Sequence, residues 1–106
     1  MTHPVRVAAE KIHPWLIETR RKIHMNPEMA FEEHETSRLV AESMAEWGLD
    51  VKPGIAQPGV AGLLDTGRPG PTIGIRADMD ALPVQEENEV PYKSKIDGKM
   101  HACGHD

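Results

Sequence analysis

The chain has 106 residues, of which 39% are hydrophobic and 27% are charged. These proportions are typical of an ordinary water-soluble domain and argue against a collagen-like, disordered or membrane-embedded protein. Seventeen acidic residues against twelve basic ones give a net charge of −5, which argues against a nucleic acid or an anionic membrane as the main partner. The first residues carry no apolar run typical of a signal peptide, so the expected location is the cytoplasm.

Apolar residues recur at a spacing of three or four from Val5 to His24, and this spacing predicts an amphipathic helix. Pro14 either kinks this helix or lies near the start of a second one. The helix is predicted to end at Asn26, because the residue before Pro27 is disfavoured in the helical region. His24 at this end is expected to act as a capping or dipole partner.

A second helix is predicted to begin in the acidic segment Glu32 to Glu35 and to end at Gly48. The two tryptophans, Trp15 and Trp47, both fall at helical spacing and are expected in the core.

Short apolar runs separated by Gly and Pro follow Gly48, and they predict strands at residues 49–52, 60–65 and 72–77. Apolar and other residues alternate strictly in the third run. Two helices followed by three strands predict an α/β fold in which helices pack on a mixed sheet.

Residues 81–100 show no periodicity. A loop of this length is uncommon inside a compact domain unless it carries function. Two neighbouring acidic residues within it, Glu86 and Glu87, are expected to be solvated charges.

Two carboxylates, Asp78 and Asp80, follow the third predicted strand directly. Residues two apart in an extended segment project to the same side, so both can face one point beyond the strand end. Open α/β sheets usually place their ligands there. The alternative is a solvated turn, since Asp is common in turns.

The closing hexapeptide contains the only cysteine, Cys103, together with His101, His105 and Asp106. If the hexapeptide is extended, the side chains of His101, Cys103 and His105 share a face that can hold a metal ion. Their spacing differs from that of the ligands in structural zinc fingers. The second reading is a Cys103 nucleophile activated by a neighbouring histidine and oriented by Asp106. The third is a buried thiol between surface histidines.

Three motifs resemble the dinuclear-metal amidohydrolase and carboxypeptidase family, which includes aminoacylase-like enzymes, hippurate hydrolase and the indole-acetyl-amino acid hydrolases. In chain order they are residues 20–28 (RRKIHMNPE), 75–83 (IRADMDALP) and 99–106 (KMHACGHD). The resemblance covers nearly the whole chain.

The resemblance implies a zinc-exopeptidase-like catalytic domain that hydrolyses the amide bond of small N-acyl amino acids with two divalent ions, zinc, manganese, cobalt or nickel. It implies Cys103 and His105 as metal ligands, and Asp80 as the catalytic aspartate that supports the metal centre. Asp78 falls where more distant relatives place a ligand histidine, which leaves its role open.

The family's general-base glutamate, an adjacent glutamate ligand and two further histidine ligands are expected downstream of the closing motif. A lid domain, which carries most of the family's dimer contacts, is expected later still. We therefore expect residues 1–106 to be the N-terminal segment of the catalytic domain, inactive alone, of an enzyme that can form a homo-oligomer. Two alternatives stay open: a metal-binding module without catalysis, and a cysteine hydrolase that uses Cys103.

Overall fold

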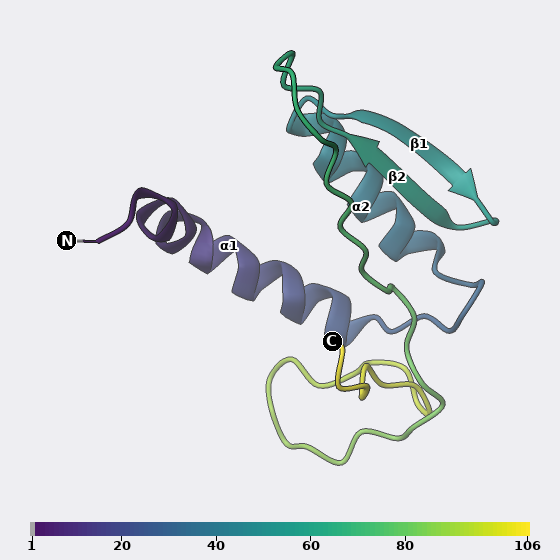
Figure 1. The fold of residues 1–106 in the computed structure, drawn as a ribbon. Helices are drawn as coiled ribbons and strands as arrows, with labels where there is room; N and C mark the ends of the chain where they lie inside the picture. The colour runs from purple at the N-terminus through teal and green to yellow at the C-terminus, as the bar shows by residue number, and fades with distance from the viewer. Residues whose placement is uncertain (1) are drawn as a thin grey trace.

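The computed structural model describes residues 2–106. Four elements follow one another along the chain (Figure 1): helix α1 (Pro4–Met25), helix α2 (His34–Glu46), strand β1 (Asp50–Ile55) and strand β2 (Gly59–Leu63). The two strands form an antiparallel hairpin that lies over α2 (Figure 1). Neither helix combines the length and the hydrophobicity that a membrane crossing requires.

Helix α1 is one continuous helix with Pro14 inside it, so no second helix begins there. Its first turn is capped by the His3 ring, whose Nδ1 accepts a hydrogen bond from the Val5 amide at 3.1 Å. Its last residue is Met25, and Asn26 caps the end by donating from its side chain to the Lys22 carbonyl at 2.8 Å. The predicted end at Asn26 is therefore confirmed.

Helix α2 is capped from a distance by the carboxylate of Glu28. One oxygen accepts from the Glu35 amide at 3.0 Å, and the other accepts from the Thr36 amide at 2.7 Å and the Thr36 hydroxyl at 2.6 Å. The residue at the capping position, Glu33, makes no such bond to the helix. Glu28 thus satisfies the free amides of the first turn, which usually bond to the residue just before a helix.

The end of α2 follows the pattern that Gly48 predicts. Gly48 has a φ of 82°, in the left-handed region that glycine tolerates best. The Gly48 amide donates to the Ala45 carbonyl at 3.0 Å, and the Leu49 amide donates to the Met44 carbonyl at 3.1 Å. These two bonds form the Schellman arrangement, which turns the chain from α2 into β1.

A second glycine, Gly62 of β2, lies against side chains from the end of α2 and from the residue just before β1. A Cβ at this position would lie 2.5 Å from the Met44 sulfur and 3.0 Å from a Leu49 methyl carbon. Any larger residue would require the Met44 and Leu49 side chains to move.

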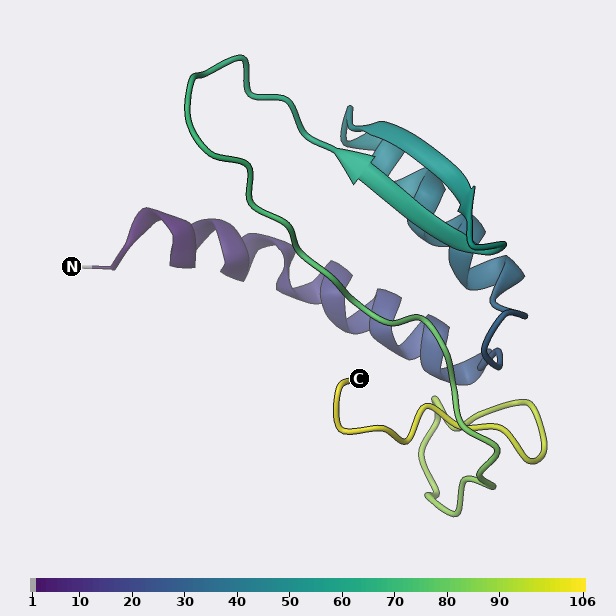
Figure 2. The same cartoon turned by 45° about the vertical axis from the view of Figure 1, so that its right-hand side comes forward.

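The prediction of a strand at residues 72–77 is wrong for this structure. These residues are extended but lie apart from β1 and β2 (Figure 2), and no other segment within residues 2–106 pairs with them. Ile73 and Ile75 are consequently 84% and 94% exposed. Alternation in sequence predicts an extended backbone, but a strand also requires a hydrogen-bonded neighbour.

The tryptophans are also more exposed than predicted. Trp15 of α1 and Trp47 at the end of α2 meet edge to face, with ring centroids 5.5 Å apart. Both rings remain in contact with solvent, because no further layer of residues 2–106 covers them. They join the two helices at the surface instead of filling a core.

The α/β fold class, with a helix packed against a sheet, is confirmed. The sheet within residues 2–106 is an antiparallel pair, so the parallel pairing that a mixed sheet requires is limited here to an isolated bridge between Met29 and Ala81.

Replacing Glu28 with glutamine is expected to lower the free energy of unfolding by about 1–2 kcal/mol at pH 7, because the capping group loses its charge and one acceptor. Burial raises the pKa of Glu28, but the bonds from Thr36 and the Glu35 amide, with nearby His34, together lower it below its usual value of 4.5. The contribution is therefore complete above pH 4.5 and is lost as the pH falls through the lower pKa of the folded state.

Urea unfolding at several pH values checks this prediction. The control is Glu32→Gln, which removes an exposed carboxylate without a side-chain hydrogen bond within the described residues. Equal stability of the two variants at pH 7 would contradict the capping role.

Candidate metal centre

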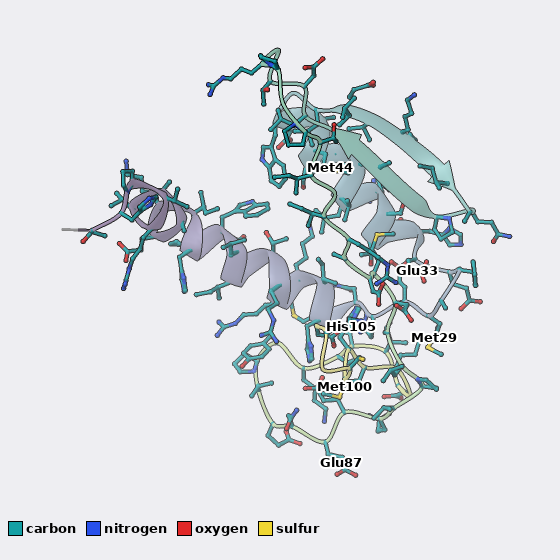
Figure 3. The ribbon with its side chains drawn as sticks, in the orientation of Figure 1. Met29, Glu33, Met44, Glu87, Met100 and His105 are labelled. Atoms are coloured by element: carbon teal, nitrogen blue, oxygen red, sulfur yellow. The ribbon has the colours of Figure 1, made fainter. Side chains whose placement is uncertain are left out.

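Two backbone pairings place the third predicted strand's end beside the closing hexapeptide. The amide of Leu82 donates to the Met100 carbonyl at 2.9 Å, and the Met100 amide donates to the Leu82 carbonyl at 3.0 Å. The Ala81 amide donates to the Glu28 carbonyl at 2.8 Å, and Ala81 is buried. These bonds hold the two residues that directly follow Asp80, and Met100 and His105 both lie below the C-terminal end of α1 in the view of Figure 3.

Three side chains converge in this region: Asp78, Asp80 and His105. Each offers one ligand atom, and these atoms lie within 4.8 Å of one another. Ligands about 2.1 Å from a zinc ion lie roughly 3–4 Å apart, so this set is close to the spacing that one metal ion needs. The prediction that both carboxylates face one point is confirmed by this geometry.

Asp78 lies between the exposed Arg76 guanidinium and the His105 imidazole. Its Oδ1 is 2.5 Å from an Arg76 guanidinium nitrogen, and its Oδ2 is 3.6 Å from His105 Nδ1. The other ring nitrogen, His105 Nε2, is 3.5 Å from Asp106 Oδ1. The ring therefore lies between two carboxylates, which can hold its orientation.

His101 is the most enclosed ring of the hexapeptide, with 9% of its side chain exposed. Its Nδ1 is 3.7 Å from Asp106 Oδ1, and its buried Nε2 has no hydrogen-bond partner within residues 2–106. Burial lowers the pKa of His101, and nearby His24 adds to this, while Asp106 and Asp80 oppose it. The ring thus carries a buried nitrogen without a hydrogen-bond partner within residues 2–106, an arrangement that calls for a further group.

The extended form of the hexapeptide is not the observed one. Residues 103–105 form a turn, and the Asp106 amide donates to the Cys103 carbonyl at 3.2 Å. Because a turn reverses the chain, residues two apart no longer share a face. The half-buried Cys103 thiol is accordingly free, and it is not part of the converging set found within residues 2–106.

The donor set of this region suits a divalent cation. His105 offers a nitrogen, Asp78 and Asp80 offer oxygens, and Cys103 offers a thiol in the same turn. Mixed imidazole, carboxylate and thiolate donors are typical of transition-metal sites.

One prediction about the loop is wrong and one is confirmed. Glu86 is 2% exposed and its carboxylate lies 2.9 Å from His24 Nε2, so the prediction of a solvated charge is wrong for Glu86. Glu87 is exposed and points away from the loop (Figure 3), as predicted. No pattern in the sequence distinguishes these neighbours, because the loop lacks the periodicity that separates buried from exposed positions.

Known proteins share both the sequence and the fold of this chain. Residues 74–106 match Peptidase family M20/M25/M40. The chain is 50% identical over 98 residues to thermostable carboxypeptidase 2 of Saccharolobus solfataricus, covering 92% of this chain and 25% of that protein. It is 52% identical over 87 residues to hippurate hydrolase of Campylobacter jejuni, covering 82% of this chain and 23% of that one.

A solved structure is similar as well. The crystal structure of a Bacillus subtilis protein, described as a dinuclear metal binding peptidase from the M20 family, superposes with a TM-score of 0.82 at 40% identity. The alignment covers 91% of this chain and 27% of the other. The resemblance to the dinuclear-metal amidohydrolase and carboxypeptidase family is confirmed, and the chain spans about a quarter of the length of these relatives.

Replacing Asp80 with asparagine is expected to weaken divalent-cation binding about 10–100-fold, since the site loses a charged oxygen that holds or orients a ligand. Calorimetric titration with Co²⁺ measures this. Asp97→Asn is the matched control, because Asp97 is exposed and lies outside the converging set. Equal Co²⁺ affinities for the two variants would show that Asp80 has no role in the site.

Proposed function

We propose, on the premise that this chain shares the motifs and the fold of the M20 hydrolases, that the complete protein is a metal-dependent amidohydrolase that cleaves N-acyl amino acids. The observation that carries the proposal is the convergence of Asp78, Asp80 and His105 within 4.8 Å. The names hippurate hydrolase and carboxypeptidase both describe hydrolysis of an amide bond to an amino acid. A small N-acyl amino acid is therefore the proposed substrate.

The proposed cofactor is a pair of divalent ions, zinc, manganese, cobalt or nickel. The description of the Bacillus subtilis relative as dinuclear supports the number, and the mixed donor set supports these elements. When bound, such ions polarise an amide carbonyl and lower the pKa of a water molecule.

The proposed ligands from this chain are Cys103 and His105. Cys103 has a free thiol and lies in the same turn as His105, which already belongs to the converging set. Asp80 supports the centre with its carboxylate. Asp78 orients the His105 ring through Nδ1, since its other oxygen is held by Arg76.

The general base lies outside residues 1–106 in this proposal. We propose that residues 1–106 form the first part of the catalytic domain and are inactive alone, and that a glutamate elsewhere in the protein serves as the general base. The fourfold greater length of the relatives supports this division. The free thiol is consistent with the proposed cytoplasmic location, where cysteines stay reduced.

The full-length protein is expected to hydrolyse N-benzoylglycine or N-acetyl amino acids, to lose this activity with a chelator and to regain it with Zn²⁺, Mn²⁺, Co²⁺ or Ni²⁺. Release of the free amino acid is the measurement. Residues 1–106 expressed alone serve as the comparison and should show no activity.

Three outcomes would contradict the proposal. Activity that survives chelation but is lost on alkylation of Cys103 would favour the cysteine hydrolase. Tight metal binding without hydrolysis of any N-acyl amino acid would favour the metal-binding module. Activity of residues 1–106 alone would refute the proposed division of the site.

A further inference from the structure

Glu86 is the most completely buried large side chain within residues 2–106. One carboxylate oxygen lies 2.9 Å from His24 Nε2 and accepts from the Ser94 amide at 2.8 Å, and the other accepts from the Asn88 side chain at 3.3 Å. A buried carboxylate is costly unless such partners surround it. These partners are therefore part of one unit, which we call the Glu86 cluster: Glu86, His24, Asn88 and Ser94.

The Glu86 cluster joins three parts of the chain. His24 lies in the last turn of α1, Glu86 lies on the outgoing arm of the loop, and Ser94 lies on the returning arm. The returning arm is tied to α1 a second time, because the Lys95 amide donates to the Met25 carbonyl at 2.9 Å.

The Ser94 side chain extends the cluster toward the closing hexapeptide. Its hydroxyl donates to the Lys99 carbonyl at 2.7 Å. Lys99 is followed by Met100, whose backbone pairs with Leu82. Hydrogen bonds and one step along the chain thus connect Glu86, through Ser94 and Lys99, to the pairing of Met100 with Leu82, which lies two residues after Asp80.

The charge of Glu86 is maintained inside the protein. Burial raises its pKa, but the bonds from the Ser94 amide, Asn88 and His24 together lower it. The His24 ring also packs edge to face against Tyr92, with centroids 6.2 Å apart, and the Arg21 guanidinium lies 4.3 Å from the Tyr92 ring centre. Tyr92 of the loop thus contacts two residues from the last turns of α1, Arg21 and His24.

We propose that Glu86 is a positioning residue for the candidate metal centre: with His24 it fixes the register of the loop that sets Asp80 against the closing hexapeptide. This inference rests on the proposed metal-binding function. It assigns to Glu86 and His24, which contact neither Asp78 nor His105 within the described hydrogen bonds, an effect on the geometry of the metal site.

The test compares Glu86→Gln with Glu87→Gln in the full-length protein. Glutamine keeps the size of residue 86 but replaces one carboxylate oxygen with an NH₂ group. This hydrogen-bond donor would face the other donors of the cluster, so one hydrogen bond is lost. The control removes the same charge one residue away, at an exposed side chain. Co²⁺ affinity is measured by calorimetry, and the geometry of bound Co²⁺ is read from its visible absorption spectrum.

We expect Glu86→Gln to weaken Co²⁺ binding about tenfold or more and to change the Co²⁺ spectrum, whereas Glu87→Gln leaves both as in the wild type. A lower melting temperature of Glu86→Gln with unchanged affinity and spectrum would show a purely structural residue and would overturn the inference. If the wild type itself fails to bind Co²⁺, the proposed function and the inference both fail.

A second pair of variants keeps the test decisive should Glu86→Gln fail to fold. His24→Gln retains a side-chain donor for Glu86, whereas His24→Ala removes it and leaves the Ser94 amide bond in place. We expect His24→Ala to change the Co²⁺ affinity and spectrum, and His24→Gln to restore them at least in part. Identical wild-type behaviour of both variants would refute the positioning role.

Discussion

The hydrogen bonds to the buried carboxylate of Glu86 are the interaction on which the loop and the candidate site depend. A loop without helix or strand has few bonds of its own, so its shape needs a fixed internal partner. Glu86 supplies this by binding the end of α1 and the returning arm of the loop at once. The pairing of Leu82 with Met100 closes the loop, and it sets the carboxylate of Asp80 beside the closing hexapeptide.

Sequence patterns within a few residues predicted the helix ends and the hairpin, because these features depend on neighbouring residues. The proline after Asn26 ends its helix by restricting the residue before it, and Gly48 ends its helix by tolerating the left-handed region. Both ends were predicted. The first two strands were also predicted, because a two-stranded hairpin needs only its own turn. The segment at residues 72–77 was not predicted correctly, since pairing depends on a neighbour that no local pattern specifies.

The candidate site was predictable where it depends on spacing and unpredictable where it depends on burial. Alternation placed Asp78 and Asp80 on one side of an extended segment, and the structure brings His105 to them. The orientation of Cys103 was not predictable, because a turn in place of an extended hexapeptide redirects its thiol. Glu86 was predicted to be solvated. This was wrong because its burial depends on a contact with His24, which is distant in the sequence and leaves no local pattern.

We propose that the carboxylates of Asp78 and Asp80 and the closing hexapeptide form one metal centre that includes the Cys103 thiolate. X-ray absorption at the zinc edge of the Zn²⁺-loaded full-length protein tests this most directly. We predict a sulfur neighbour at about 2.3 Å beside nitrogen and oxygen neighbours at about 2.0–2.2 Å, with the sulfur lost in Cys103→Ala. A first shell that contains only nitrogen and oxygen in the wild type would contradict the account.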